Sequence, residues 1–322
     1  AAIILFTFVL LGGCGPQGNK SVAITSENPA ASKESEPAAP VTKKRVALVM
    51  KTLTNPFFIE MEKGARKAED ELGIELIVKT GSKETSIEQQ VSIIEELISD
   101  KVDAIVIAPA DSVKLVPVLK KAKDAGIPIV NIDNRLDSKM MEKAELKDIP
   151  FISVDNFTAA YKAAQYLSQK IKSPVKAAII EGIRGADNAE QRKNGVLKAF
   201  AENSNITIAA KETANWKIDE ASDVTEKILK KTPDIKLIFC ANDMMALGVL
   251  NYLNKSGKKD IIVGGYDAIP EALDAVKKGT LAVTVNQQAD LQGYAGVSSA
   301  VKLINKESVE KEVLVDVKII TP

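Results

Sequence analysis

Polar and aromatic side chains that could bind a small ligand recur at or shortly after the ends of short apolar runs. The set consists of Lys51, Asn55, Phe57, Phe58, Asp133, Asn134, Arg192, Trp216, Asn242, Asp267 and Gln287. Carboxylates and amides can each bridge neighbouring hydroxyl groups, and a guanidinium supplies a rigid fork of donors. Flat aromatic faces suit the C–H side of a sugar ring. The set therefore predicts a site for a polyhydroxylated neutral ligand.

The composition excludes several other kinds of chemistry. The chain has no histidine, which excludes histidine-ligated zinc, Ser-His or Cys-His nucleophile pairs and imidazole acid–base catalysis. Its two cysteines, Cys14 and Cys240, are too few for a disulfide framework or a four-thiolate metal site. The 43 Lys and Arg residues balance the 43 Asp and Glu residues, which argues against a nucleic-acid partner. We expect no cofactor and no metal.

Each residue of the set also has an ordinary structural interpretation. Asn55 precedes Pro56 and could simply cap a helix that begins there. Asp133 could be another cap, Asp267 could close a turn, and Trp216 could belong to the core. No single residue is specific, and the prediction of a site depends on their repeated occurrence at strand ends.

The elements that must position these residues follow from the alternation of apolar runs and amphipathic segments after Arg45. The apolar runs predict strands over residues 46–50, 74–78, 104–108, 127–132, 175–180, 206–210, 236–240, 261–265, 281–285 and 313–319. Amphipathic segments between them predict helices. Continuous apolar strands between helices indicate parallel sheets covered on both faces, so the fold class is α/β.

Two doubly wound lobes explain this length of chain better than one open sheet. About 280 residues of alternating strands and helices is long for a single sheet. A single barrel is the structural alternative. In open α/β sheets, ligands bind beyond the carboxyl ends of the strands, where the polar set lies.

The first residues predict a targeting segment. Residues 3–11 read IILFTFVLL, an apolar run too short to span a bilayer, so we expect a signal-peptide remnant over 1–13. Leu-Gly-Gly-Cys at 11–14 resembles a bacterial lipobox, which predicts lipidation of Cys14; an ordinary buried cysteine is the alternative. Residues 14–43 have few large apolar side chains and predict a disordered tether. We therefore expect an extracytoplasmic protein anchored to the bacterial membrane by lipid.

The chain resembles the sugar-binding proteins of ABC importers, above all those for ribose and allose, over about residues 44–322. Seven ordered segments carry the resemblance: KTLTNPFF (51–58), VNIDNRLD (130–137), IIEGIRGADNAEQRKNG (179–195), ANW (214–216), FCANDMMALGV (239–249), GGYDAIPEA (264–272) and VNQQADLQG (285–293). The resemblance implies a type I periplasmic-binding-protein fold, in which two Rossmann-like lobes are joined by three hinge strands and clamp one ligand. It implies a first lobe of residues 44–154 plus 288–315 and a second of 155–287 plus 316–322.

The resemblance also implies roles for the polar set. Asn55, Phe57 and Phe58 would line the first lobe, and Asp133 would take paired sugar hydroxyls. The second lobe would contribute Arg192, an aromatic wall at Trp216, and polar contacts from Asn242, Asp267 and Gln287. Lys51 matches a lysine of allose-type members that ribose-type members lack. Asn134 departs from both, because ribose-type members have arginine there and allose-type members an acidic residue, so the exact sugar stays open.

The implied function is a monomeric, non-enzymatic receptor that delivers a monosaccharide to an ABC permease and its ATPase. A sensory receptor for a membrane kinase or chemoreceptor is an alternative, as is the same fold binding a nucleoside or polyol. Asp133 and Asp267 could also be a carboxylate pair for glycoside hydrolysis, which we disfavour. A DNA-binding repressor with a similar core is excluded because the region before Arg45 contains no helix-turn-helix.

Overall fold

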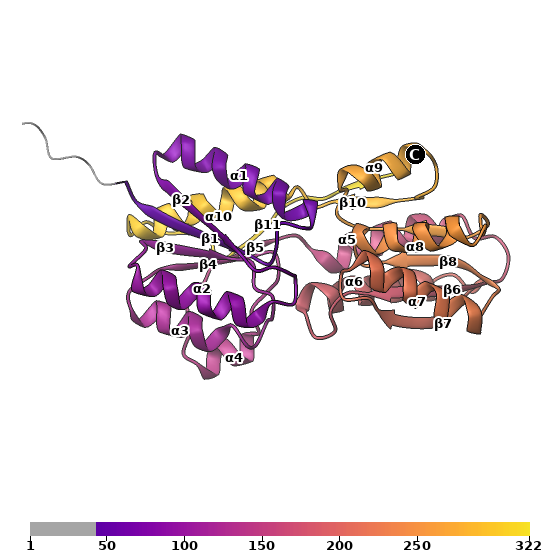
Figure 1. Cartoon of the computed structure of the whole chain (residues 1–322), viewed down its shortest axis with the longest axis horizontal. Helices are drawn as coiled ribbons and strands as arrows, with labels where there is room; N and C mark the ends of the chain where they lie inside the picture. The colour runs from indigo at the N-terminus through magenta and orange to yellow at the C-terminus, as the bar shows by residue number, and fades with distance from the viewer. Residues whose placement is uncertain (1–42) are drawn as a thin grey trace, which may run out of the picture. The chain divides into compact units, whose positions relative to one another are not determined.

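The computed structural model describes residues 43–322, which form two parallel β-sheets, each covered by helices (Figure 1). The expected signal remnant, Cys14 and nearly all of the expected tether lie outside these residues. Within the described residues, no helix has both the length and the apolar character needed to cross a membrane.

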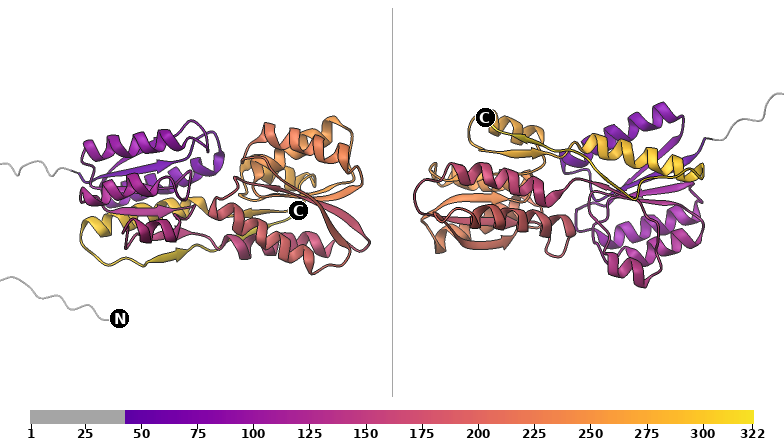
Figure 2. Two further views of the ribbon diagram at one scale, coloured as in Figure 1. Left: turned by 90° about the horizontal axis from the view of Figure 1, so that it is seen from below. Right: turned by 180° about the vertical axis from the view of Figure 1, so that it is seen from behind.

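The first sheet has six parallel strands in the order β11-β5-β4-β3-β1-β2. Its strands are β1 (Arg45–Met50), β2 (Glu75–Thr80), β3 (Ala104–Ile107), β4 (Ile129–Ile132), β5 (Phe151–Ser153) and β11 (Glu312–Leu314). Its helices are α1 (Pro56–Leu72), α2 (Ile87–Ser99), α3 (Val116–Asp124), α4 (Ser138–Lys143) and α10 (Ala289–Ile304). Figure 2 shows α10, in yellow, alongside the indigo α1, far from it in sequence.

The alternation of side chains along β1 explains how this sheet is covered. Val46, Leu48 and Met50 face the core that contains α1 and α10, whereas Ala47 and Val49 face the core that contains α2 and α3. All five side chains are fully buried. A strand with both faces buried reads as a continuous apolar run, which is why the sequence predicts β1 well.

The second sheet has four parallel strands in the order β7-β6-β8-β9. Its strands are β6 (Val175–Glu181), β7 (Ile206–Thr213), β8 (Ile235–Cys240) and β9 (Ile262–Gly264). Its helices are α5 (Asn156–Gln169), α6 (Asp187–Ala201), α7 (Ile218–Lys231), α8 (Asp243–Lys255) and α9 (Pro270–Lys277). Each sheet with its helices therefore has the expected α/β architecture with parallel strands.

The end of the chain differs from expectation, because residues 313–319 do not form one strand. β11 pairs parallel with β5 in the first sheet, whereas β12 (Lys318–Ile320) pairs antiparallel with β10 (Thr284–Asn286) beside the second. A bridge between Gly264 and Val283 joins this pair to β9. The chain thus crosses from one sheet region to the other three times. The crossings lie between β5 and α5, between β10 and α10, and between β11 and β12.

Candidate functional site

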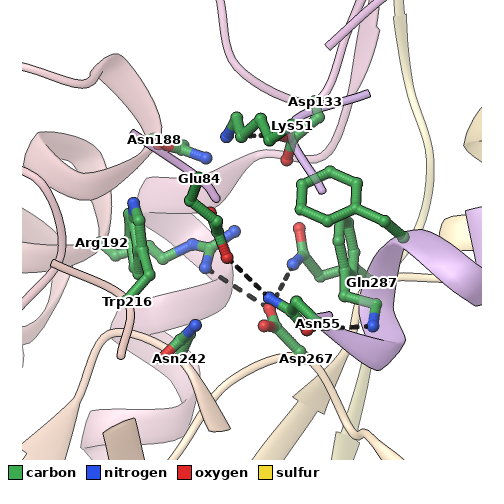
Figure 3. A pocket seen from close by; sticks show the side chains of 12 residues that line it. Lys51, Asn55, Glu84, Asp133, Asn188, Arg192, Trp216, Asn242, Asp267 and Gln287 are labelled. Atoms are coloured by element: carbon green, nitrogen blue, oxygen red, sulfur yellow. Dashed lines mark hydrogen bonds and ion pairs between the residues drawn. The ribbon is translucent and has the colours of Figure 1, made fainter. Parts of the chain in front are cut away.

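A polar pocket with an empty volume of about 240 Å³ lies where the carboxyl ends of both sheets meet (Figure 3). It is lined by Lys51, Asn55, Phe57, Phe58, Glu84, Asp133, Asn188, Arg192, Trp216, Asn242, Asp267 and Gln287. Most of the lining side chains are polar or charged, and three aromatic rings lie among them. The pocket therefore suits one small polar ligand.

An ion pair occupies the side of the pocket formed by the first sheet. Lys51 Nζ lies 2.8 Å from Asp133 Oδ2, and each side chain is only 4% exposed. Asp133 adopts a positive φ of 61° directly after β4, and the Ser153 hydroxyl donates to its carbonyl oxygen at 2.7 Å. The backbone turn thus directs the Asp133 carboxylate towards Lys51 and the pocket.

Asn55 and Asn242 cap helices and line the pocket at the same time. The Oδ1 atom of Asn55 accepts a hydrogen bond from Phe57 N at 3.1 Å, at the start of α1. The Oδ1 atom of Asn242 accepts one from Met245 N at 2.9 Å, at the start of α8. Because capping uses the oxygen, each side chain keeps its NH₂ group as a donor. The capping interpretation of Asn55 and its place in the pocket are therefore compatible.

Arg192 is held in place from several directions on the second sheet's side. Its Nε donates to Asn156 Oδ1 at 2.8 Å and its Nη1 to the Ala241 carbonyl at 2.9 Å. The guanidinium lies 3.9 Å from the Tyr266 ring centroid, and Nη1 lies 3.5 Å from Asp267 Oδ1. The fork of donors is thus fixed before any ligand arrives, which lowers the entropic cost of binding.

Asp267 stands on a strained turn between β9 and α9. Its φ is 128° and that of Ala268 is 56°, conformations that L-residues rarely adopt. Gln287 Nε2 donates to Asp267 Oδ1 at 2.6 Å. Burial raises the pKa of the Asp267 carboxyl well above its usual value, and the nearby Arg192 opposes this rise.

The turn is stabilised from behind by Asp243, the first residue of α8. Its carboxylate accepts hydrogen bonds from Thr284 Oγ1 at 2.8 Å and from Ile269 N at 3.1 Å. Ala268 N in turn donates to Thr284 Oγ1 at 3.1 Å. Asp243 is fully buried, and this burial raises the pKa of its carboxyl from 3.8 to about 6. Asp243 therefore orients Asp267 without lining the pocket.

Trp216 forms an aromatic wall because the chain turns sharply before α7. Asn215 and Trp216 have positive φ angles of 48° and 66°. The indole packs against the backbone of Gly182, and its ring lies 5.6 Å from the Arg192 guanidinium carbon. Phe57 and Phe58, 5.1 Å apart in an edge-to-face arrangement, provide aromatic surface from α1.

The structure places every residue of the predicted set in the lining of this pocket except Asn134. The Asn134 amide donates to the Pro109 carbonyl and to Ser112 Oγ, both at 3.2 Å, and its Oδ1 accepts from Asn188 N at 3.4 Å. These hydrogen bonds hold the Asn134 side chain outside the pocket. The following Arg135 forms an ion pair with Glu312 and also lies outside the pocket.

Two pocket residues were not among the predicted set. Asn188 lies in the first turn of α6. Glu84 lies in the loop between β2 and α2, and its Oε1 accepts a hydrogen bond from Asn55 Nδ2 at 2.8 Å. Burial raises the pKa of the Glu84 carboxyl. Both residues follow the carboxyl end of a strand, as the predicted residues do. Glu84, however, comes four residues after β2 ends, in a loop that contains no other residue of the pocket.

The model of the periplasmic binding protein domain family matches residues 46–308. The chain belongs to this family. Its members are binding proteins of transport systems and not enzymes. The fold is accordingly the type I periplasmic binding protein fold.

Similar proteins include several with a sugar in their names. The D-ribose/D-allose-binding protein of Pseudomonas aeruginosa is 38% identical over 273 residues, which cover 84% of this chain and 85% of that protein. The D-allose-binding periplasmic protein of Escherichia coli is 35% identical, covering 78% of this chain and 81% of that protein. A solute binding protein from Actinobacillus succinogenes, solved with bound D-allose, is 42% identical with a TM-score of 0.82, covering 87% of this chain and 98% of its own.

Proposed function

We propose that this binding protein captures one monosaccharide, an aldose of the allose or ribose type, and delivers it to an ABC importer. The observation that carries the proposal is that two charged pairs, Lys51–Asp133 and Arg192–Asp267, face one small pocket from opposite sheets. The relatives named for ribose and allose support the choice of sugar.

The pocket chemistry matches a ring with several hydroxyl groups. Carboxylates accept from hydroxyls, whereas the amide of Asn242 and the guanidinium of Arg192 donate to them. Aromatic faces at Trp216 and Phe58 can cover the apolar side of the ring. A sugar that lacks one hydroxyl would leave a desolvated group unpaired, which costs about 1–3 kcal/mol. Such a site selects strongly among stereoisomers.

A ligand in this pocket would couple the two lobes. Residues 44–154 plus 288–315 would form the first lobe and residues 155–287 plus 316–322 the second, with the three crossings as hinges. Because the ligand contacts both lobes, it favours the closed arrangement by the difference between its affinities for the closed and open states. The closed form would then be the one that the permease binds.

The proposed setting is outside the cytoplasmic membrane. Cys14 would carry the lipid anchor and residues 14–43 would form the tether, so a monomer could reach its permease while remaining membrane-bound. Incorporation of radiolabelled palmitate into the wild-type chain, and its loss in Cys14→Ala, would test the anchor.

The first test of the function is calorimetric titration of protein freed of bound sugar by unfolding and refolding. We expect D-allose or D-ribose to bind with a micromolar or lower Kd at one site per chain. Trp216 is the single tryptophan of the chain, so its fluorescence should change in parallel. No heat with either aldose would contradict the proposal.

A cyclic polyol is the second candidate, and the same titration includes it. A solute binding protein from Bacillus halodurans with bound myo-inositol is 28% identical to this chain, with a TM-score of 0.79. Binding of myo-inositol without binding of either aldose would favour this candidate.

A further inference from the structure

Glu84 is the one carboxylate of the pocket that has no cation partner among the described residues. Asp133 pairs with Lys51 and Asp267 with Arg192, at 2.8 and 3.5 Å. No lysine or arginine of residues 43–322 lies within ion-pair distance of Glu84. Glu84 is therefore the only one of the three pocket carboxylates whose partner among the described residues is neutral.

The hydrogen bond to Asn55 leaves half of the Glu84 carboxylate free. Asn55 Oδ1 is engaged by Phe57 N in the helix cap, so the orientation of the amide is fixed and Nδ2 faces Glu84 Oε1. Within residues 43–322, no group donates to Glu84 Oε2. An ionised carboxylate can accept about four hydrogen bonds, so Glu84 has room for a ligand donor.

The position of Glu84 directs this free capacity towards the ligand. Figure 3 shows its side chain reaching into the pocket towards Asn55, from a loop of the first sheet. The charged groups whose fields act on it are Lys51 and Asp133 on its own side and Arg192 and Asp267 on the other. Together the pocket holds three carboxylates and two cations.

We propose that Glu84 is a specificity-determining residue that accepts a hydrogen bond from a ligand hydroxyl through its free oxygen. The inference rests on the proposed function, because it requires a hydroxylated ligand in this pocket. A partly desolvated carboxylate with one neutral partner is poorly satisfied, and a hydroxyl that donates to it forms a charge-assisted bond. A ligand with that hydroxyl is therefore favoured over the analogue without it.

The test compares the full chain with Glu84→Gln by calorimetric titration with the aldose that the wild type binds best. Glutamine keeps an acceptor for Asn55 Nδ2 but loses the charge. We expect the Kd to rise at least tenfold in Glu84→Gln. Glu88→Gln, an exposed residue at the start of α2 outside the pocket, is the matched control and should stay within twofold of the wild type.

A double-mutant cycle separates ligand contact from a role exerted through Asn55. Asn55→Ser retains a capping oxygen but removes the amide that Glu84 binds. If Glu84 touches the ligand, Glu84→Gln still weakens binding at least tenfold in the Asn55→Ser background. If it only positions Asn55, the second substitution has no further effect, which overturns the inference.

Failure of the proposed function gives a different result. If the wild type binds none of the sugars, the proposed function and the inference both fall. If the wild type binds an aldose and Glu84→Gln binds it equally well, only the inference falls. Circular dichroism melting without ligand checks folding, and Glu84→Asp, which withdraws the carboxylate from the ligand but keeps the charge, is expected to weaken binding as well should Glu84→Gln fail to fold.

Discussion

The indole of Trp216 occupies the space in which a side chain at position 182 would begin. A Cβ atom added to Gly182 would lie 2.0 Å from Trp216 Cη2, far inside van der Waals contact. The φ angle of Gly182 is not positive, so its backbone conformation does not require glycine. Glycine is required because the indole ring leaves no space for a side chain. The position of the aromatic wall thus depends on a residue that has no side chain.

Gly182→Ala is therefore expected to displace Trp216 and weaken sugar binding by about tenfold or more. The indole must move because the neighbouring backbone is packed in β6. Titration gives the Kd, and the emission maximum of Trp216 reports its displacement. Gly185→Ala is the control, since nothing lies within 4 Å of its Cβ position although its φ is +88°. It should lower stability without changing the emission maximum. Unchanged affinity and emission in Gly182→Ala would contradict the prediction.

Asn242 allows its two roles to be separated by two substitutions. Asn242→Ala removes both the cap of α8 and the amide donor, so it should lower the free energy of unfolding by about 1 kcal/mol and weaken binding. Asn242→Ser keeps a capping oxygen and should retain stability while losing affinity to the same extent. Urea unfolding and calorimetric titration measure the two effects. Equal affinity of Asn242→Ser and the wild type would show that the amide does not contact the ligand.

Asp243 should make stability depend on pH. Its pKa is raised from 3.8 to about 6 in the folded state, so the folded state binds the proton more tightly than the unfolded state. The contribution of Asp243 to the free energy of unfolding is therefore smallest above pH 6. It rises by about 3 kcal/mol as the pH falls from about 6 to about 4 and then levels off. Asp243→Asn removes this component.

Urea unfolding of both proteins between pH 4 and 8 checks this prediction. The difference in unfolding free energy between wild type and Asp243→Asn should change in favour of the wild type as the pH falls through this window. Glu84, whose carboxyl pKa is also raised, remains in both proteins and is expected largely to cancel in the difference. The Asp243 charge also raises the pKa of the Asp267 carboxyl, so the difference reports Asp243 and Asp267 together and keeps the same sign. A constant difference would contradict the raised pKa.

The excess of acidic groups in the pocket predicts discrimination against anionic sugars. Glu84, Asp133 and Asp267 outnumber Lys51 and Arg192, and both cations already have carboxylate partners. An added carboxylate would therefore be desolvated without a free cation to pair with, which is unfavourable. The uronate of the aldose that binds should therefore bind about a hundredfold more weakly than its uronamide, which has the same size and no charge. Competition against the parent sugar measures both, and equal affinities would show that charge plays no part.

Periodicity alone predicts the central strands, because their buried faces leave a clear apolar run. β1 and β8 are such strands, with almost every side chain buried. The three-residue strands β5, β11 and β12 carry too few residues for a period. Residues 313–319 are predicted as one strand because apolar residues continue through the whole segment. The segment is divided into β11 and β12 because one part pairs with β5 and the other with β10, and this pairing depends on tertiary structure.

The same limit explains the difference at Asn134. In an extended chain, the side chains of Asp133 and Asn134 would point to opposite sides. The positive φ of 61° at Asp133 redirects the chain, so Asn134 meets Pro109 and Ser112. Strand-end position predicts which loops approach the pocket, but the local backbone angle decides which of two adjacent side chains enters it. Glu84 was missed for a related reason, since nothing in its loop's sequence reveals that it folds back towards Asn55.

The division of the last residues between β11 and β12 has a consequence for biosynthesis. While residues 312–320 are still inside the ribosome, the first sheet lacks an edge strand and β10 lacks its antiparallel partner. The first sheet cannot be completed before residues 312–314 emerge, and β10 cannot be paired before residues 318–320 emerge, since these contacts join segments far apart in the chain. The two sheets therefore reach their final pairing almost together during synthesis.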